Sequence, residues 1–90
     1  MATINVEPGQ LISNGKEIVS ESVSYKSEIE KIYSIIDELS GAWSGQAASK
    51  FTSDIRKFKD DFENFGKLIG EFGELLEAVG NDYQRLEENL

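Results

Sequence analysis

The sequence predicts an all-α fold, a helical hairpin that turns near Trp43 and dimerises into an antiparallel four-helix bundle. Its 90 residues suffice for one domain, residues 1–90, and the single Pro leaves the backbone free for long helices. In each half of the chain apolar residues recur at alternating steps of four and three, the heptad spacing of packed helices. Between the halves, residues 40–45 have the Gly and Ser content of a turn.

The first helix is expected over about residues 8–39. Pro8 suits the first turn of a helix, because the N–H group that Pro lacks would have no intrahelical acceptor there. Residues 1–7 are expected to form an extended, mobile arm before it. The apolar stripe of this helix consists mainly of Leu11, Ile18, Tyr25, Ile29, Ile32, Ile36 and Leu39.

The turn is expected at residues 40–45. Gly41 suits the left-handed conformation that ends many helices, and the Ser44 hydroxyl suits the cap of the next helix. Trp43, the only Trp, leaves two interpretations open: an aromatic plug at the end of the bundle, or an exposed recognition residue.

The second helix is expected over about residues 46–88, and all five Phe residues lie on its apolar stripe. Four glycines interrupt it, Gly66, Gly70, Gly73 and Gly80, each at a cost of about 1 kcal/mol relative to Ala. Three of them repeat every seven residues, directly after stripe positions. Such a strip permits close approach of another helix, and a hinge or a contact with a later partner is the alternative.

Dimerisation is predicted from apolar residues outside the two stripes, such as Ile12, Val19, Leu68 and Leu75. Burying a large apolar side chain contributes about 1.5 to 3 kcal/mol, and a lone hairpin has no third element to cover these residues. The predicted core of hairpin and dimer comprises Ile18, Tyr25, Ile29, Ile32, Ile36, Phe51, Ile55, Phe58, Phe62, Phe65, Ile69 and Phe72.

The composition disfavours most chemistry. A formal net charge of -8 opposes binding to nucleic acid, and zero Cys and zero His remove thiol nucleophiles and the usual general base. Asp60, Asp61 and Glu63 stand beside Arg56, Lys57 and Lys59, so pairing of these charges along a solvated face is expected. We therefore expect no catalytic residues, no metal site, no cofactor and no enzymatic activity. The first residues also lack the basic and apolar segments of a cleavable signal peptide.

Two short motifs carry a family resemblance. Trp43-Ser44-Gly45 lies between the two helices, and Tyr83 and Glu87, four residues apart, lie near the end of the second. This combination, over essentially the whole chain, resembles the WXG family of small substrates of the type VII (ESX, or Ess) secretion system, in particular EsxA-like proteins of Gram-positive bacteria. The resemblance implies a turn motif of Trp43 and Gly45 and a secretion signal of Tyr83 and Glu87. From the pattern alone, Tyr83 would be a core residue beside an exposed Glu87.

The resemblance also implies partners and a location. The chain would form a homodimer, or a heterodimer with a related small helical protein, be recognised by the type VII secretion ATPase, and be secreted without a cleavable signal peptide. It would then act as a virulence-associated effector through protein or membrane contacts. The residues themselves add the hypothesis of a membrane-active protein at low pH, because the bundle has Phe-rich stripes and its seventeen acidic residues lose charge in acid. The alternative is an adaptor or chaperone-like partner for a larger substrate.

Overall fold

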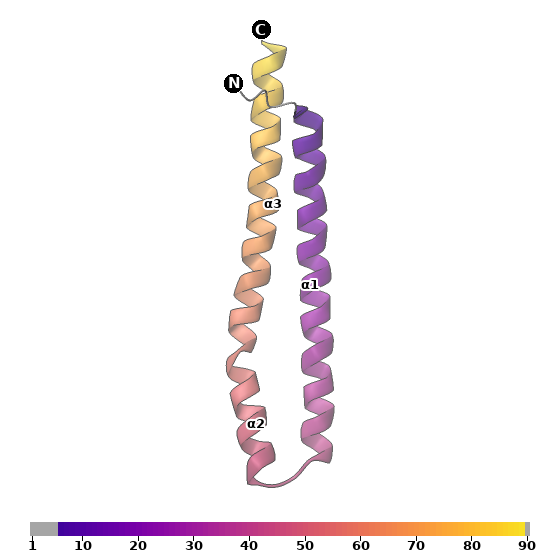
Figure 1. Cartoon of the computed structure of the whole chain (residues 1–90), viewed down its shortest axis with the longest axis vertical. Coiled ribbons are helices and arrows are strands. Elements are labelled where there is room, and N and C mark those ends of the chain that lie inside the picture. The colour runs from indigo at the N-terminus through magenta and orange to yellow at the C-terminus, as the bar shows by residue number, and fades with distance from the viewer. Residues whose placement is uncertain (1–5, 90) are drawn as a thin grey trace.

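The structure, a computed structural model, describes residues 6–89 and confirms the all-α helical hairpin. One arm is α1 (Pro8–Ala42), and the other consists of α2 (Gln46–Lys57) followed by α3 (Lys59–Glu88). The arms run antiparallel in a molecule of 69 × 22 × 18 Å, with the turn at one end and both the start of α1 and the end of α3 at the other (Figure 1). Pro8 lies in the first turn of α1 as expected. The predicted mobility of residues 1–5 lies outside the described residues.

The turn is built differently from the expectation. Gly41 lies inside α1, which continues to Ala42, and Trp43 follows in an extended conformation. Among residues 6–89, the one residue with a positive φ is Gly45, at 114°. Its carbonyl oxygen accepts the N–H of Ser49 at 3.1 Å and so begins the hydrogen bonding of α2. The predictions of a left-handed Gly41 and a capping Ser44 are therefore wrong: the reversal falls at the second Gly, and the N-cap of α2 makes no side-chain hydrogen bond.

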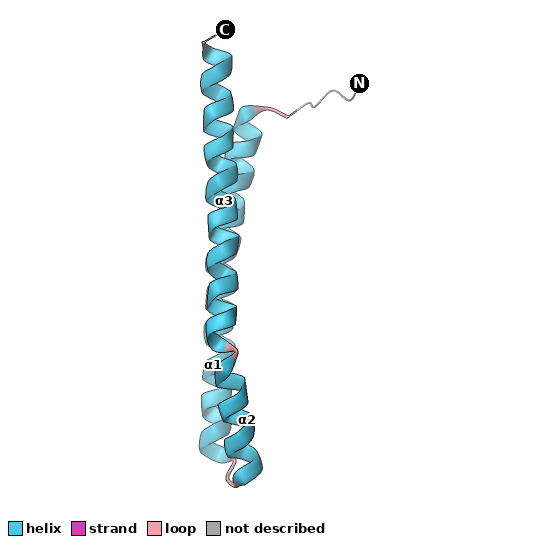
Figure 2. Cartoon of the chain, turned by 90° about the vertical axis from the view of Figure 1, so that its left-hand side faces the viewer, coloured by secondary structure: helices cyan, strands magenta, loops and turns pink. Residues whose placement is uncertain are grey.

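The second arm is broken where one continuous helix was expected. Phe58, with φ -82° and ψ -11°, separates α2 from α3. Its N–H donates to the carbonyl of Ile55, three residues back, at 3.2 Å, rather than to the residue four back as in an α-helix. The break is visible as a bend in Figure 1 and as the short loop segment between α2 and α3 in Figure 2.

Glycines hold α1 and α3 together. A Cβ atom built on Gly73 would lie 2.7 Å from the carbonyl oxygen of Gly15, and one on Gly80 would lie 2.8 Å from Cγ1 of Ile12. At Gly66 the nearest atom would be Cδ1 of Tyr25, at 3.0 Å. Of the two interpretations of the glycine strip, close packing is the one these contacts support, and the break in the arm falls at Phe58 instead.

Because the glycines face α1, the phenylalanines lie beside the contact and not inside it. The buried apolar side chains of the described hairpin are Tyr33 and Ala48, which the predicted core did not include. Six of the predicted core residues are half-buried, namely Ile18, Tyr25, Ile29, Ile36, Ile55 and Ile69. The other six are exposed on the hairpin, namely Ile32, Phe51, Phe58, Phe62, Phe65 and Phe72. Their burial in a dimer stays a prediction.

Candidate functional site

Large apolar side chains form an exposed apolar face on the hairpin. Phe58 at the break and eight large apolar side chains of α3 are 41% to 68% exposed; the eight are Phe62, Phe65, Leu68, Phe72, Leu75, Val79, Tyr83 and Leu86. Their spacing of three, four and seven residues places them along one side of the helix. Tyr25 of α1 meets Phe65 edge-on, with ring centroids 5.7 Å apart. Ile32 and Leu39 follow Tyr25 at intervals of seven and extend this face onto α1.

The turn motif lies at the closed end of the hairpin. The ring centroid of Trp43 is 5.8 Å from that of Phe51, and 41% of Trp43 remains exposed. Trp43 thus closes part of the hairpin end while keeping part of its surface accessible. Gly45 supplies the positive φ that a residue with a side chain rarely adopts. Both residues line a groove of about 560 Å³, and five of its nine lining residues carry a hydroxyl group, namely Ser40, Ser44, Ser49, Thr52 and Ser53.

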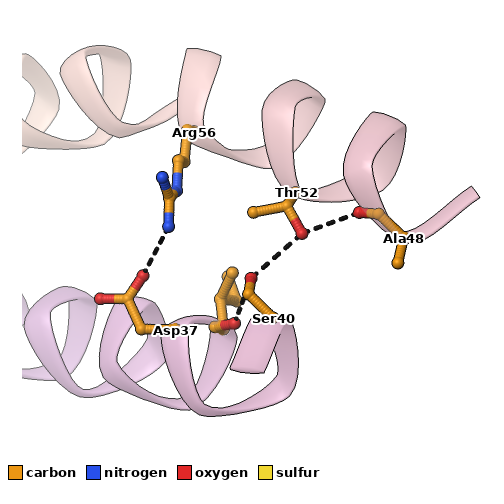
Figure 3. A network of polar contacts seen from close by, with 6 residues as sticks. Asp37, Ser40, Ala48, Thr52 and Arg56 are labelled. Atoms are coloured by element: carbon orange, nitrogen blue, oxygen red, sulfur yellow. Dashed lines mark hydrogen bonds and ion pairs between the residues drawn. The ribbon is translucent and has the colours of Figure 1, made fainter. Parts of the chain in front are cut away.

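Side-chain hydrogen bonds hold α2 against α1 next to this turn (Figure 3). Ser40 Oγ lies 3.1 Å from Thr52 Oγ1, while Thr52 donates to the carbonyl of Ala48 at 2.8 Å. Arg56 Nη2 donates to Asp37 Oδ1 at 3.1 Å. We did not predict this network, because it joins residues 12 and 19 positions apart, whereas the charge pattern indicated pairing along one helix.

Other charges near the break also differ from the expectation. Lys57 pairs with Asp54, three residues earlier, at 3.5 Å. Lys59 Nζ lies 5.7 Å from the ring centroid of Tyr33. The expected pairing of the basic run with Asp60, Asp61 and Glu63 is therefore wrong for Arg56 and Lys57, since their acidic partners lie on α1 and earlier in α2.

The C-terminal motif lies at the open end. Tyr83 is 41% exposed, so in the single hairpin it is not the core residue that the pattern indicated. The pKa of Tyr83 is raised above its ordinary value of 10.0, first by the negative charge of Glu87, then by the polar contact with that carboxylate, by burial and by the charge of Glu7. Tyr83 and Glu87 therefore form one local polar and aromatic surface.

The two motifs do not meet within one chain. Trp43 follows the last residue of α1 at the turn, whereas Tyr83 and Glu87 lie in the last turns of α3, at the opposite end of the 69 Å molecule (Figure 1). Any site that combines them requires a second chain.

The remaining surface offers charge without a catalytic arrangement. A groove of about 850 Å³ runs between α1 and α3, and charges of both signs line it, including Lys26, Glu30, Lys67 and Glu71. Among residues 6–89, no group of three or more acidic residues is placed to hold a metal ion. In the same part of the chain, the helices are all too polar or too short to cross a membrane.

Comparisons with known proteins agree with this geometry. The family described as "Proteins of 100 residues with WXG" matches residues 3–88. No match was found among curated proteins. Similar solved structures include EsxA of Geobacillus thermodenitrificans, with a TM-score of 0.84 at 20% identity, covering 97% of this chain and 95% of that one. They also include EsxB of Bacillus anthracis str. Sterne, described as a secreted protein, with a TM-score of 0.80 at 18% identity, covering 97% and 99%.

At these identities the solved structures show a shared fold, and the family match rests on the sequence itself. It spans the Trp43-Ser44-Gly45 turn and reaches past Tyr83 and Glu87. The hairpin, its Trp-containing turn and the match over residues 3–88 together establish that the chain belongs to the WXG family of small helical proteins.

Proposed function

We propose that this protein is a small substrate of the type VII secretion system, exported as a folded antiparallel homodimer. The observation that carries the proposal is the apolar face of α3, where seven large side chains besides Tyr83 are exposed on the hairpin. Association of two chains costs about 4 to 15 kcal/mol, while burying one large apolar side chain contributes about 1.5 to 3 kcal/mol. These side chains are already partly buried, yet half that contribution from each of the seven, summed over two copies, gives about 10 to 21 kcal/mol, which offsets the cost over most of its range.

An antiparallel second copy would also bring together the turn motif and the C-terminal motif, which lie at opposite ends of one hairpin. It would bring the partner's Tyr83 and the partner's Glu87 close to Trp43, and twofold symmetry would create the same composite site at the other end. The exposed part of Trp43 and the exposed ring of Tyr83 support this arrangement, because both are available for recognition. The secretion ATPase would bind this composite surface.

After export, the protein would act as a virulence-associated effector through contacts with proteins or membranes outside the producing cell. The apolar face supports both modes, since a dimer that opens would present it to another surface. Acid would favour membrane contact, because protonation of the seventeen carboxylates removes the charge that repels an anionic bilayer.

Export tests the proposal through the C-terminal motif. In the native producer, the double variant Tyr83→Ala with Glu87→Ala should remain in the cells, while the wild type appears in the medium and a cytosolic marker does not. Gln84→Ala with Glu88→Ala is the matched control, because it removes a neighbouring pair with the same spacing, and we expect it to be exported. All three proteins should keep the same helicity and dimer mass. Normal export of the Tyr83 and Glu87 variant would reject the signal.

An adaptor for a larger secreted protein is the second candidate. The observation that favours it is the groove between α1 and α3. Val23 of α1 lines this groove, is 65% exposed and does not belong to the apolar face of α3. A foreign helix could lie there. Purification from the native cell under non-denaturing conditions distinguishes the two: a second, different chain in equal amount supports the adaptor, and self-association alone supports the homodimeric substrate.

A further inference from the structure

The break at Phe58 coincides with a side chain that reaches it from the other arm. Tyr33 of α1 is 7% exposed, and its hydroxyl donates to the carbonyl oxygen of Ile55 at 2.9 Å. A buried Tyr hydroxyl needs a hydrogen-bond partner, because leaving it unpaired costs about 1 to 3 kcal/mol. The backbone of α2 supplies that partner.

The carbonyl group that accepts the Tyr33 hydroxyl, that of Ile55, is also the one whose α-helical hydrogen bond is lost at the break. In a continuous α-helix the carbonyl of Ile55 would accept the N–H of Lys59. Here it accepts the Tyr33 hydroxyl and the N–H of Phe58, which closes a tighter turn. Insertion of a side chain into the hydrogen-bond ladder is a known cause of helix kinks.

Local sequence offers no competing explanation. Residues 46–65 contain neither Gly nor Pro, the residue types that most often kink a helix. Lys59, the first residue of α3, places its ammonium group 5.7 Å from the centroid of the Tyr33 ring. Both sides of the break thus contact the same side chain.

The two sides of the break are also held differently. α3 packs along α1 through Gly15, Gly73 and Gly80, where no atom could be added without a clash. α2 contacts α1 at few places, and the contacts that hold it include the hydrogen bonds of Ser40 with Thr52 and of Arg56 with Asp37. We call α1 together with α3 the stem, and α2 with the turn, residues 43–57, the turn unit.

We propose that Tyr33 is a wedge that divides the second arm, so that the turn unit hinges on the stem at Phe58. This device goes beyond export itself: it makes the end that carries Trp43 a separately moving part. Breaking the polar contacts that join the turn unit to α1 allows the turn unit to swing, while the glycine contacts between α1 and α3 stay closed.

Amide exchange of the full-length protein, measured by NMR, tests the wedge. In Tyr33→Phe the carbonyl of Ile55 is free to accept the N–H of Lys59, so that amide should exchange about tenfold more slowly relative to the Phe72 amide of the stem. Tyr25→Phe is the matched control: it removes one hydroxyl from α1 where the helix opposite is unbroken, and it should leave the ratio unchanged. A ratio in Tyr33→Phe within about a factor of two of the wild-type ratio would overturn the wedge.

Spin labels test the hinge, and the absence of native Cys makes their placement simple. Ser53→Cys with Lys67→Cys spans the break, and Lys67→Cys with Asn81→Cys spans the same fourteen residues within α3, about 21 Å along a straight helix. In dimers diluted with unlabelled chain, we expect a broader distance distribution across the break than within α3, and Tyr33→Phe should narrow it. Equal widths in the wild type, or no narrowing in Tyr33→Phe, would overturn the hinge.

Discussion

The stem and the turn unit solve the same packing problem by opposite means. In the stem, missing side chains bring two backbones together, as at Gly73 and Gly15. In the turn unit, hydroxyl and charged side chains span the gap, as between Thr52 and Ser40 and between Arg56 and Asp37. Backbone-to-backbone packing leaves no space for an added atom or a shift of the helices, whereas side-chain hydrogen bonds can break and re-form. A helical hairpin can therefore be rigid at one end and adaptable at the other without a change of fold.

The largest effect is expected from an added atom in the stem. A Cβ on Gly73 would lie 2.7 Å from the Gly15 carbonyl oxygen and 2.8 Å from the Val19 nitrogen, and backbone atoms cannot turn aside. Gly73→Ala should lower the free energy of unfolding by about 2 to 3 kcal/mol. Urea unfolding followed by circular dichroism, at one protein concentration, measures it.

Gly66→Ala is the control for that experiment, because its Cβ would meet the Tyr25 ring, at 3.0 Å, and a side chain can shift. We expect a clearly smaller loss than for Gly73→Ala. Equal losses of unfolding free energy at the two positions would show that the backbone contact at Gly73 contributes no more to stability than the side-chain contact at Gly66.

An intermediate effect is expected from the polar contacts of the turn unit. Thr52→Val keeps the shape of the side chain but removes its hydrogen bonds to Ser40 and Ala48, at a cost of about 1 kcal/mol. Hydrogen exchange should accelerate in α2 while the amides of α3 keep their rates. Ser53→Ala, an exposed position on the same helix, should change neither. If α3 accelerated as much as α2, the stem and the turn unit would not be separate units.

A smaller effect on stability is expected at alkaline pH from Tyr33, at the boundary between the stem and the turn unit. The pKa of Tyr33 is raised above its ordinary value of 10.0, first by burial and then by the charges of Glu63, Asp60 and Asp61. The folded chain therefore holds this proton more tightly than the unfolded chain does. The contribution to stability is complete below pH 10.0 and is lost as the pH rises through the folded-state pKa. Melting temperatures measured from about pH 9 to 12 should fall less steeply for Tyr33→Phe than for the wild type or Tyr25→Phe. Parallel curves for all three would contradict this.

The smallest effect is expected at Gly41, inside α1, where an added Cβ would meet nothing within 4 Å. Gly41→Ala should raise the free energy of unfolding by about 0.5 to 1 kcal/mol, because Ala restricts the unfolded chain and favours the helix. Urea unfolding measures this gain as well. A loss of stability would mean that Gly41 needs a conformation other than the helical one.

Periodic features of the fold could be predicted from the sequence. Heptad spacing indicated the hairpin, Pro8 its first helical turn, and the repeat of Gly66, Gly73 and Gly80 a close approach of helices. Each of these depends on spacing along one helix, which the chain displays directly. The motifs of Trp43 and Tyr83 could likewise be identified in the sequence, and the predicted hairpin places them at opposite ends of the molecule.

Features that depend on contacts between the arms could not be predicted. The break at Phe58 depends on the hydroxyl of Tyr33, 22 residues away from its acceptor Ile55. The exposure of the Phe residues of α3 follows from its glycines facing α1, and heptad spacing does not distinguish a stripe that faces its neighbour from one that flanks the contact. Gly41 and Gly45 were equally suited to a positive φ, and only the path of the chain selects between them.

The elongation of the hairpin has a consequence for passage through narrow openings. Its radius of gyration is 20.3 Å, whereas a compact chain of this length would have one of about 12 Å. All of that excess lies along one axis. Moving lengthwise, a single hairpin presents a cross-section of only 22 × 18 Å, so its folded state can pass through a conduit too narrow for a compact globule of equal mass.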